Sequence, residues 1–180
     1  MRRIALFAVV VACACGRETG LDTVVDSSAD PAIWRRDAEK IAGALPHAIG
    51  AFAPREAVDP FATSYRTGPV FGASCVYADG GKQLLVRVES GNIAARSVAA
   101  LDPGTPSGAK AAGRQLTVKG SPAVARWDED GRESEITFLV SRRFIVQLRV
   151  VPAAGAGEAP LLAEAFDEGA LKALSLEGVR

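Results

Sequence analysis

The stretch SEITFLVSRRFIVQLRVV, residues 134 to 151, decides the fold class of this chain. Apolar and polar residues alternate in it, which is typical of β-strands with one buried face. The apolar positions are Ile136, Phe138, Val140, Phe144, Val146, Leu148 and Val150. They form two runs separated by the polar residues 141–143, so the sequence predicts a β-hairpin.

The length of the hairpin loop follows from the requirement that both apolar runs share one face of the sheet. A shift of one residue in the pairing would turn a whole run to the opposite face. If Val140 pairs with Phe144, all the apolar positions lie on the same face. We therefore predict strands at 134–140 and 144–151, joined by the three-residue loop 141–143.

A second hairpin is predicted at 70–78 and 82–90, with its turn at Gly80-Gly81. Glycine tolerates the positive φ angles that two-residue hairpin turns require. The cross-strand pairs in this register are Tyr77 with Leu84, Cys75 with Val86, and Ala73 with Val88. One face is apolar throughout, and the position of Cys75 on it favours a buried, unpaired thiol.

An amphipathic helix is predicted before these strands. Asp30 suits the N-cap position and Pro31 the first helical position, and Pro46 ends the pattern. Apolar residues recur at spacings of four, three and four, at Trp34, Ala38, Ile41 and Leu45. Residues 47–60 contain two more prolines and are predicted to be a loop.

The remaining elements complete the fold class. Strands are predicted at 114–119 and 123–128, a short helix at 92–101, and a C-terminal helix that opens at Pro160 and is broken at Gly169. This order predicts an α+β fold: an antiparallel β-sheet of about five to seven strands, with the N- and C-terminal helices packed on one face.

Composition fits one globular domain. The chain has 180 residues, of which 48% are hydrophobic and 23% charged, so it carries enough apolar surface to fold. Lys and Arg number 21, and Asp and Glu number 21. Because the charges balance, no nucleic-acid partner is expected.

The N-terminus has the pattern of an export signal. Residues 1–3 are basic at two positions, and IALFAVVVA, residues 4–12, is an apolar run of nine residues. A membrane-spanning helix needs about 20 residues, so the run is too short to be a permanent transmembrane anchor. Its length is that of the apolar region of a signal peptide.

The apolar run ends at CACG, residues 13–16. This ending resembles the lipobox of bacterial lipoproteins, in which a small residue precedes a cysteine that is diacylated before the signal is cleaved. Cys13 matches the pattern better, with Val10 three residues before it and Ala12 directly before it, but its signal of only twelve residues is short for the family. Cys15 follows Ala14 and leaves a longer signal, although Ala12 stands where an aliphatic residue is usual. We favour Cys15 as the lipidated residue, with Cys13 as the alternative.

The resemblance implies a protein of the bacterial cell envelope, held at a membrane by lipid with its domain outside the cytoplasm. Acyl chains on one cysteine would make membrane residence stable. Residues 1–14 would then be the signal peptide, 15–29 a flexible tether, and 30–180 a single α+β domain.

The choice of cysteine bears on a disulfide. If Cys13 carried the lipid, Cys15 would remain as a thiol in an oxidising compartment and would be a potential partner of Cys75. If Cys15 carries the lipid, Cys75 is left without a partner.

Catalytic and metal-binding patterns are lacking in the sequence. His47 is the only histidine and lies just after a predicted helix, with no recognisable nucleophile motif elsewhere. One histidine with one distant cysteine does not supply a zinc ligand set. We therefore expect no catalytic residues, no metal site and no cofactor.

An acidic cluster surrounds Gly131. Asp128, Asp130, Glu133 and Glu135 resemble half of a calcium loop, but the third loop carboxylate and the closing glutamate are missing. An Asp-Gly pair between two strands is also what a turn requires, so we predict a turn at this place.

Three hypotheses for function remain open. The first is a lipid-anchored, non-enzymatic envelope domain that binds an unknown protein or small-molecule partner. The second is an envelope hydrolase using carboxylates such as Asp128 or Glu135, and the third is a purely structural envelope protein. Arg142 and Arg143, at the tip of a predicted hairpin, are candidates for contact with phospholipid head groups.

Overall fold

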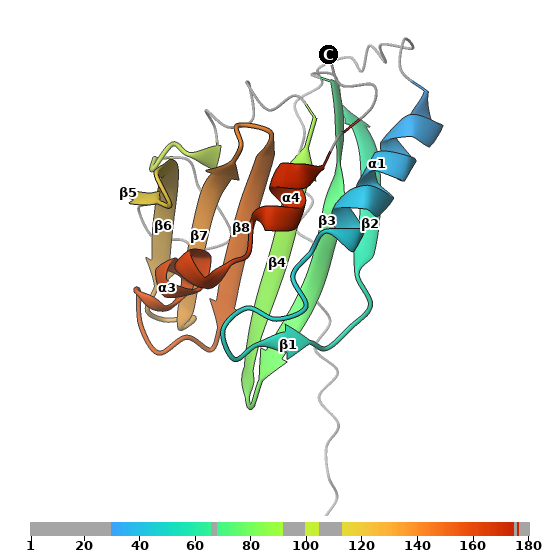
Figure 1. Cartoon of the computed structure of the whole chain (residues 1–180). Coiled ribbons are helices and arrows are strands. Elements are labelled where there is room, and N and C mark those ends of the chain that lie inside the picture. Colours follow the sequence, from blue (N-terminus) through green and yellow to red (C-terminus); the bar gives the residue numbers. More distant parts are fainter. Residues whose placement is uncertain (1–29, 66–67, 92–99, 105–112, 175, 177–180) are drawn as a thin grey trace, which may run out of the picture.

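Eight β-strands form one antiparallel sheet in the described part of the chain (Figure 1). This computed structural model describes residues 30–65, 68–91, 100–104, 113–174 and 176. The strand order is β1-β3-β4-β8-β7-β6-β5, and β2 also pairs with β3. The predicted antiparallel sheet with accompanying helices is confirmed, although the described strands number eight rather than five to seven.

The additional strands lie in the predicted loop or directly after it, where the pattern turns to strands from Phe61. β1 (Ala53–Pro54) and the start of β2 (Asp59–Tyr65) fall in or next to residues 47–60. Among the described strands, both pair only with β3 (Gly68–Asp79), at one border of the sheet. Proline is tolerated in an edge strand because one side of that strand needs no ladder hydrogen bonds.

Both predicted hairpins are confirmed with their registers. β3 pairs with β4 (Lys82–Ser90) in the predicted register, including Cys75 opposite Val86. β7 (Glu133–Val140) pairs with β8 (Phe144–Val151), with Val140 opposite Phe144 across a three-residue loop. Alternation of apolar residues was a sufficient guide because one face of each strand is buried.

The third hairpin differs from its prediction by its turn. β5 is Arg114–Val118 and β6 is Ser121–Asp128. Val118 pairs with Ser121, so Lys119 and Gly120 alone form the turn, with φ angles of 47° and 80°. Positive φ at both central positions is the geometry of a two-residue hairpin turn.

The N-terminal helix is confirmed. α1 (Pro31–Gly43) begins at an N-cap where the Asp30 carboxylate accepts a hydrogen bond from the Ala32 amide at 2.9 Å. Trp34, Ala38 and Ile41 are buried, as the predicted apolar stripe requires. α1 contacts β2 and β3.

The C-terminal helices begin at residues other than those predicted. α3 is Glu158–Ala165, so Pro160 is its third residue rather than its first. Proline is acceptable there because the first-turn N–H groups have no acceptor within the helix. The chain leaves helical geometry at Phe166, and α4 (Gly169–Ala173) begins at Gly169, where a break was predicted.

One core cluster joins the helices to alternate residues of the sheet. Figure 1 shows α1, α3 and α4 in front of the sheet. The cluster includes Ala38, Ile41, Tyr77, Val86, Phe138, Val146, Ala163 and Phe166. Trp34 belongs to the cluster, and the partly buried Trp127 packs against it.

Several predictions fall on residues outside the described ranges. These are the signal and the tether with Cys13 and Cys15, and most of the short helix at 92–101. Within the described ranges, no helix is both long and apolar enough to cross a bilayer.

Candidate functional site

The second face of the sheet carries the most extensive arrangement of charged side chains, and we call it the polar face. Its residues alternate along each strand with those of the core. One row across the sheet follows directly from the strand register and consists of Val76, Leu85, Arg149, Glu135 and Arg126. The next row consists of Ser74, Arg87, Gln147, Thr137 and Val124.

Arg126 and Glu135 form a buried ion pair between β6 and β7. Their side chains are 2% and 0% exposed, and Arg126 Nη1 lies 3.5 Å from Glu135 Oε1. Arg126 Nη2 also donates a hydrogen bond to the carbonyl oxygen of Asp102 at 3.0 Å. The pair therefore ties two neighbouring strands to the segment that precedes β5.

Arg149 extends this arrangement to β8. Its Nη2 donates to Glu133 Oε2 at 2.5 Å, and Arg149 also stands directly opposite Glu135 in the strand register. Glu133 is buried, whereas the Arg149 side chain is 38% exposed. We call Arg126, Glu135 and Arg149, which lie in register across the sheet, together with the neighbouring Glu133, the charged row. Its two positive and two negative charges balance.

A smaller pair lies on β4. Arg87 Nε donates to Glu89 Oε1 at 2.7 Å, and the Arg87 guanidinium carbon lies 4.2 Å from the centre of the Phe61 ring on β2. An arginine over an aromatic face is attracted by the negative potential of the ring. Arg87 thus links the polar face of β4 to the edge strand.

Two hollows open on the polar face beside these charges. The larger, of about 310 Å³, is lined by Val76, Gln83, Leu85, Arg149 and Val151. The smaller, of about 150 Å³, is lined by Arg87, Glu89, Ala100, Thr137, Ile145 and Gln147. Apolar walls with a few convergent polar groups are the usual lining of small-molecule sites.

A third hollow, of about 470 Å³, lies at the β5–β6 hairpin. Its lining residues are Leu101, Gln115, Leu116, Thr117, Gly120, Pro122 and Ala123. None of these side chains is ionisable, so this hollow offers shape and amide or hydroxyl groups but no acid or base.

The carboxylates suggested for hydrolysis have structural contacts. Glu135 is fully buried against Arg126. Asp128 accepts a hydrogen bond from the Gly131 amide at 3.2 Å, which is the contact of the predicted turn. Neither residue lines any of the three hollows.

His47 is exposed after α1, and the described residues contain no group of three metal-ligating side chains.

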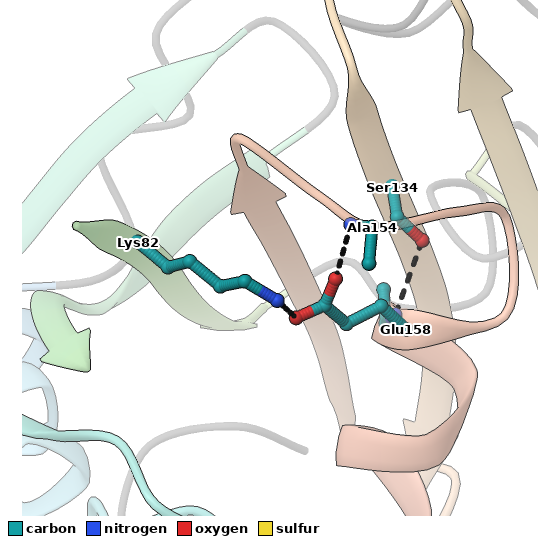
Figure 2. Close-up of polar contacts among 5 residues, drawn as sticks. Lys82, Ser134, Ala154 and Glu158 are labelled. Carbon is teal, nitrogen blue, oxygen red and sulfur yellow. Dashed lines mark hydrogen bonds and ion pairs between the residues drawn. The ribbon is translucent and has the colours of Figure 1, made fainter. Parts of the chain in front are cut away.

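Figure 2 shows a second polar arrangement, at the start of α3. Lys82 Nζ and the Ala154 amide donate to the two oxygens of Glu158, at 2.5 and 2.6 Å. Burial opposes ionisation of Glu158, but these hydrogen bonds and the lysine charge outweigh it and lower the pKa of the carboxyl. Ser134 Oγ accepts from the Ala159 amide at 3.1 Å. These contacts fasten α3 to the sheet.

Cys75 is a buried free thiol within the described part of the chain. Its Sγ lies 3.5 Å from the carbonyl oxygen of Glu56. Burial, and then the negative charge of Glu56, raise the pKa of the thiol. Burial also raises the pKa of Tyr77 to about 12, and its hydroxyl donates to the carbonyl oxygen of Pro46 at 2.6 Å. Both groups stay protonated, as core residues.

Arg142 and Arg143 lie at the exposed β7–β8 tip, where the sequence placed them. Arg143 Nη1 donates to the carbonyl oxygen of Leu174 at 3.1 Å. The charged row was not predicted from the sequence. Opposite charges do stand on the same faces of neighbouring strands in the sequence. They could be matched to one another only once the pairing of β6, β7 and β8 was known.

Comparison of the chain with protein-family models, with curated proteins and with solved structures gives no match.

Proposed function

We propose that this protein is a lipid-anchored binding domain of the bacterial cell envelope, without enzymatic activity of its own. The observation that carries the location is the apolar run that ends at CACG, with Cys15 as the lipidated residue and Cys13 as the alternative. In this proposal the N- and C-terminal helices close one face of the sheet, and the polar face receives the partner.

The contacts of the polar face support binding rather than hydrolysis. A general acid or base must reach the substrate, whereas Glu135 is buried against Arg126 and Asp128 holds a turn. The 310 Å³ hollow combines apolar walls with Gln83 and Arg149. Such a lining suits a small amphipathic molecule with a hydrogen-bonding or anionic group.

The anchor is tested by the intact mass of the protein purified from its native membrane fraction, compared with Cys13→Ser and Cys15→Ser variants. We expect a lipid-sized mass increment that is lost in Cys15→Ser and retained in Cys13→Ser. The reverse pattern would select Cys13. An unmodified protein released into the medium would refute the lipoprotein assignment.

The binding site is tested by native mass spectrometry of the same preparation. Leu85→Trp fills the 310 Å³ hollow, and we expect it to abolish any small-molecule adduct seen with the wild type. Leu161→Trp makes the same change at a side chain that is 73% exposed on α3, and it should retain the adduct. An adduct kept in Leu85→Trp, or none in the wild type, would contradict binding in this hollow.

A further inference from the structure

The two ends of the sheet differ in charge. The β5–β6 and β7–β8 connections lie at one end, because Val118 pairs with Ser121 and Val140 with Phe144 while β6 and β8 both run antiparallel to β7. The exposed basic residues of these two connections are Lys119, Arg142 and Arg143. Lys119 Nζ also donates a hydrogen bond to the carbonyl oxygen of Phe166, and Arg143 Nη1 donates one to that of Leu174. Carbonyl partners leave the positive charge of both side chains uncompensated. We call this the basic end.

The opposite end carries acidic residues. There the β3–β4 and β6–β7 connections expose Asp79, Glu129 and Asp130. Lys82 at this end is paired with Glu158, and Arg132 is exposed. The described connections of the sheet thus place positive charge at one end and mainly negative charge at the other.

The backbone at the basic tip favours glycine, yet arginine stands there. Ser141 and Arg142 have φ angles of 53° and 54°, and the turn closes with a hydrogen bond from the Arg143 amide to the Val140 carbonyl oxygen at 3.0 Å. A left-handed backbone is unfavourable for residues with a side chain. Arg132 at the acidic end has the same backbone conformation, with φ 48°, so it offers a matched comparison for Arg142.

The domain begins at the basic end. The hydrogen bond from Tyr77 to the Pro46 carbonyl oxygen places the C-terminal end of α1 towards the β3–β4 connection, at the acidic end. In Figure 1 the N-terminal end of α1 lies at the same end of the sheet as the β7–β8 connection. The N-terminal segment that leads to Cys15 therefore joins the domain at the basic end.

We propose that the basic end of the sheet, with Lys119, Arg142 and Arg143, rests on an anionic phospholipid surface. This inference relies on the proposed lipid anchor. A short tether confines the domain near the surface, so a weak contact that would fail between free molecules becomes effective. One arginine at an anionic lipid surface changes the docking constant about fivefold. In this orientation the acidic end points away from the lipid.

The test replaces the lipid with an artificial tether. The chain from Gly16 onward carries an N-terminal histidine tag and is held on vesicles with nickel-chelating lipid, in phosphatidylcholine alone or mixed with phosphatidylglycerol. Backbone amide hydrogen exchange is then compared between the two vesicles. We expect exchange at 119–120 and 141–143 to be about fivefold slower on the anionic vesicles, and this difference to vanish at high salt.

Arg142→Gly should remove most of this protection, and it should do so without unfolding the domain because glycine suits the backbone there. Arg132→Gly is the matched control: it removes the same charge from an exposed residue with φ 48°, at the acidic end. We expect it to leave the protection unchanged.

Equal exchange on both vesicles would overturn the proposal, as would protection at 129–132 or an equal loss in both variants. Because the histidine tag supplies the attachment, a failure of docking is distinct from a failure of lipidation. Lipidation is read separately, from the intact mass.

Discussion

At the scale of the residue, left-handed backbone conformations stand out in the hairpin connections. Lys119, Arg132, Ser141 and Arg142 have φ angles between 47° and 54°, although each carries a side chain. The Cβ atom makes this conformation unfavourable by about 1 kcal/mol or more. The backbone at these residues therefore lowers the stability of the fold. Substitution by glycine removes this strain together with the side chain, so its effect on stability can be compared with its effect on binding.

Glycine at position 142 should stabilise the protein. Relief of the left-handed strain outweighs the extra freedom of glycine in the unfolded chain, so we expect Arg142→Gly to gain about 0.5 kcal/mol. The change is read as a higher melting temperature in thermal unfolding. Arg132→Gly should behave alike, and a lower melting temperature in both variants would refute the strain argument.

Glu158 should make the stability of the domain depend on pH. Its pKa is lowered below the ordinary value of 4.5, so its stabilising effect is present above that value and is lost as the pH falls through the lower pKa of the folded state. We expect Glu158→Gln to cost about 1 kcal/mol near neutral pH and nothing in strong acid.

Denaturant unfolding of wild type and Glu158→Gln across pH measures this difference. Glu164→Gln is the control, because Glu164 is an exposed residue of the same helix. A stability difference that persists below the pKa of the folded state would show that Lys82 and Ala154 do not act through the carboxylate charge.

At the scale of the element, the charged row holds three strands together through their polar face. Arg126 on β6, Glu135 on β7 and Arg149 on β8 follow one another across the sheet. Buried charges are stable only when they are compensated, so the row depends on all of its members. It gives the strands a specific polar contact in addition to their apolar core.

Removal of one partner from the buried pair should be far more harmful than removal of both. We expect Glu135→Ala to cost about 3–5 kcal/mol because the Arg126 guanidinium loses its carboxylate. The double variant Arg126→Met with Glu135→Leu should be more stable than Glu135→Ala by at least about 2 kcal/mol. Denaturant unfolding measures both changes.

Glu129→Ala serves as the control for this series. Glu129 is exposed in the neighbouring connection, and its loss should change stability by no more than about 0.5 kcal/mol. If the double variant proved as unstable as Glu135→Ala, the pair would contribute more than charge compensation.

At the scale of the whole molecule, one core spans the sheet and its helices, and Cys75 reports on its cooperativity. The thiol is buried in this core and its pKa is raised. A thiol-specific reagent can therefore react with it only when the sheet opens. In a Cys13→Ser, Cys15→Ser background we expect labelling at least about a thousandfold slower in buffer than in denaturant.

An Ala170→Cys variant provides an exposed thiol on α4 as the comparison. It should react in buffer at a rate close to that of the unfolded chain. Rapid labelling of Cys75 in the folded protein would mean that β3 opens independently of the rest of the core.

The sequence alone was sufficient for the central part of the fold. Period-two alternation predicted the β3–β4 and β7–β8 hairpins with their registers, and the 3.6-residue pattern with its Asp30 cap predicted α1. These features are local: each depends on residues close together in the chain, and a wrong register would expose an apolar face to water. The N-terminal export pattern is equally local, and the anchor inferred from it stays a prediction.

Only the tertiary structure decided the edge strands, the charged row, the hollows of the polar face and the contrast between the two ends of the sheet. The prolines of the predicted loop 47–60 concealed β1 and the first two residues of β2, because the pairing of these strands uses a border of β3 that the sequence does not reveal. The charged row and the two ends join residues from different hairpins. Periodicity shows which face a side chain occupies, whereas its partners depend on the order and direction in which the strands assemble.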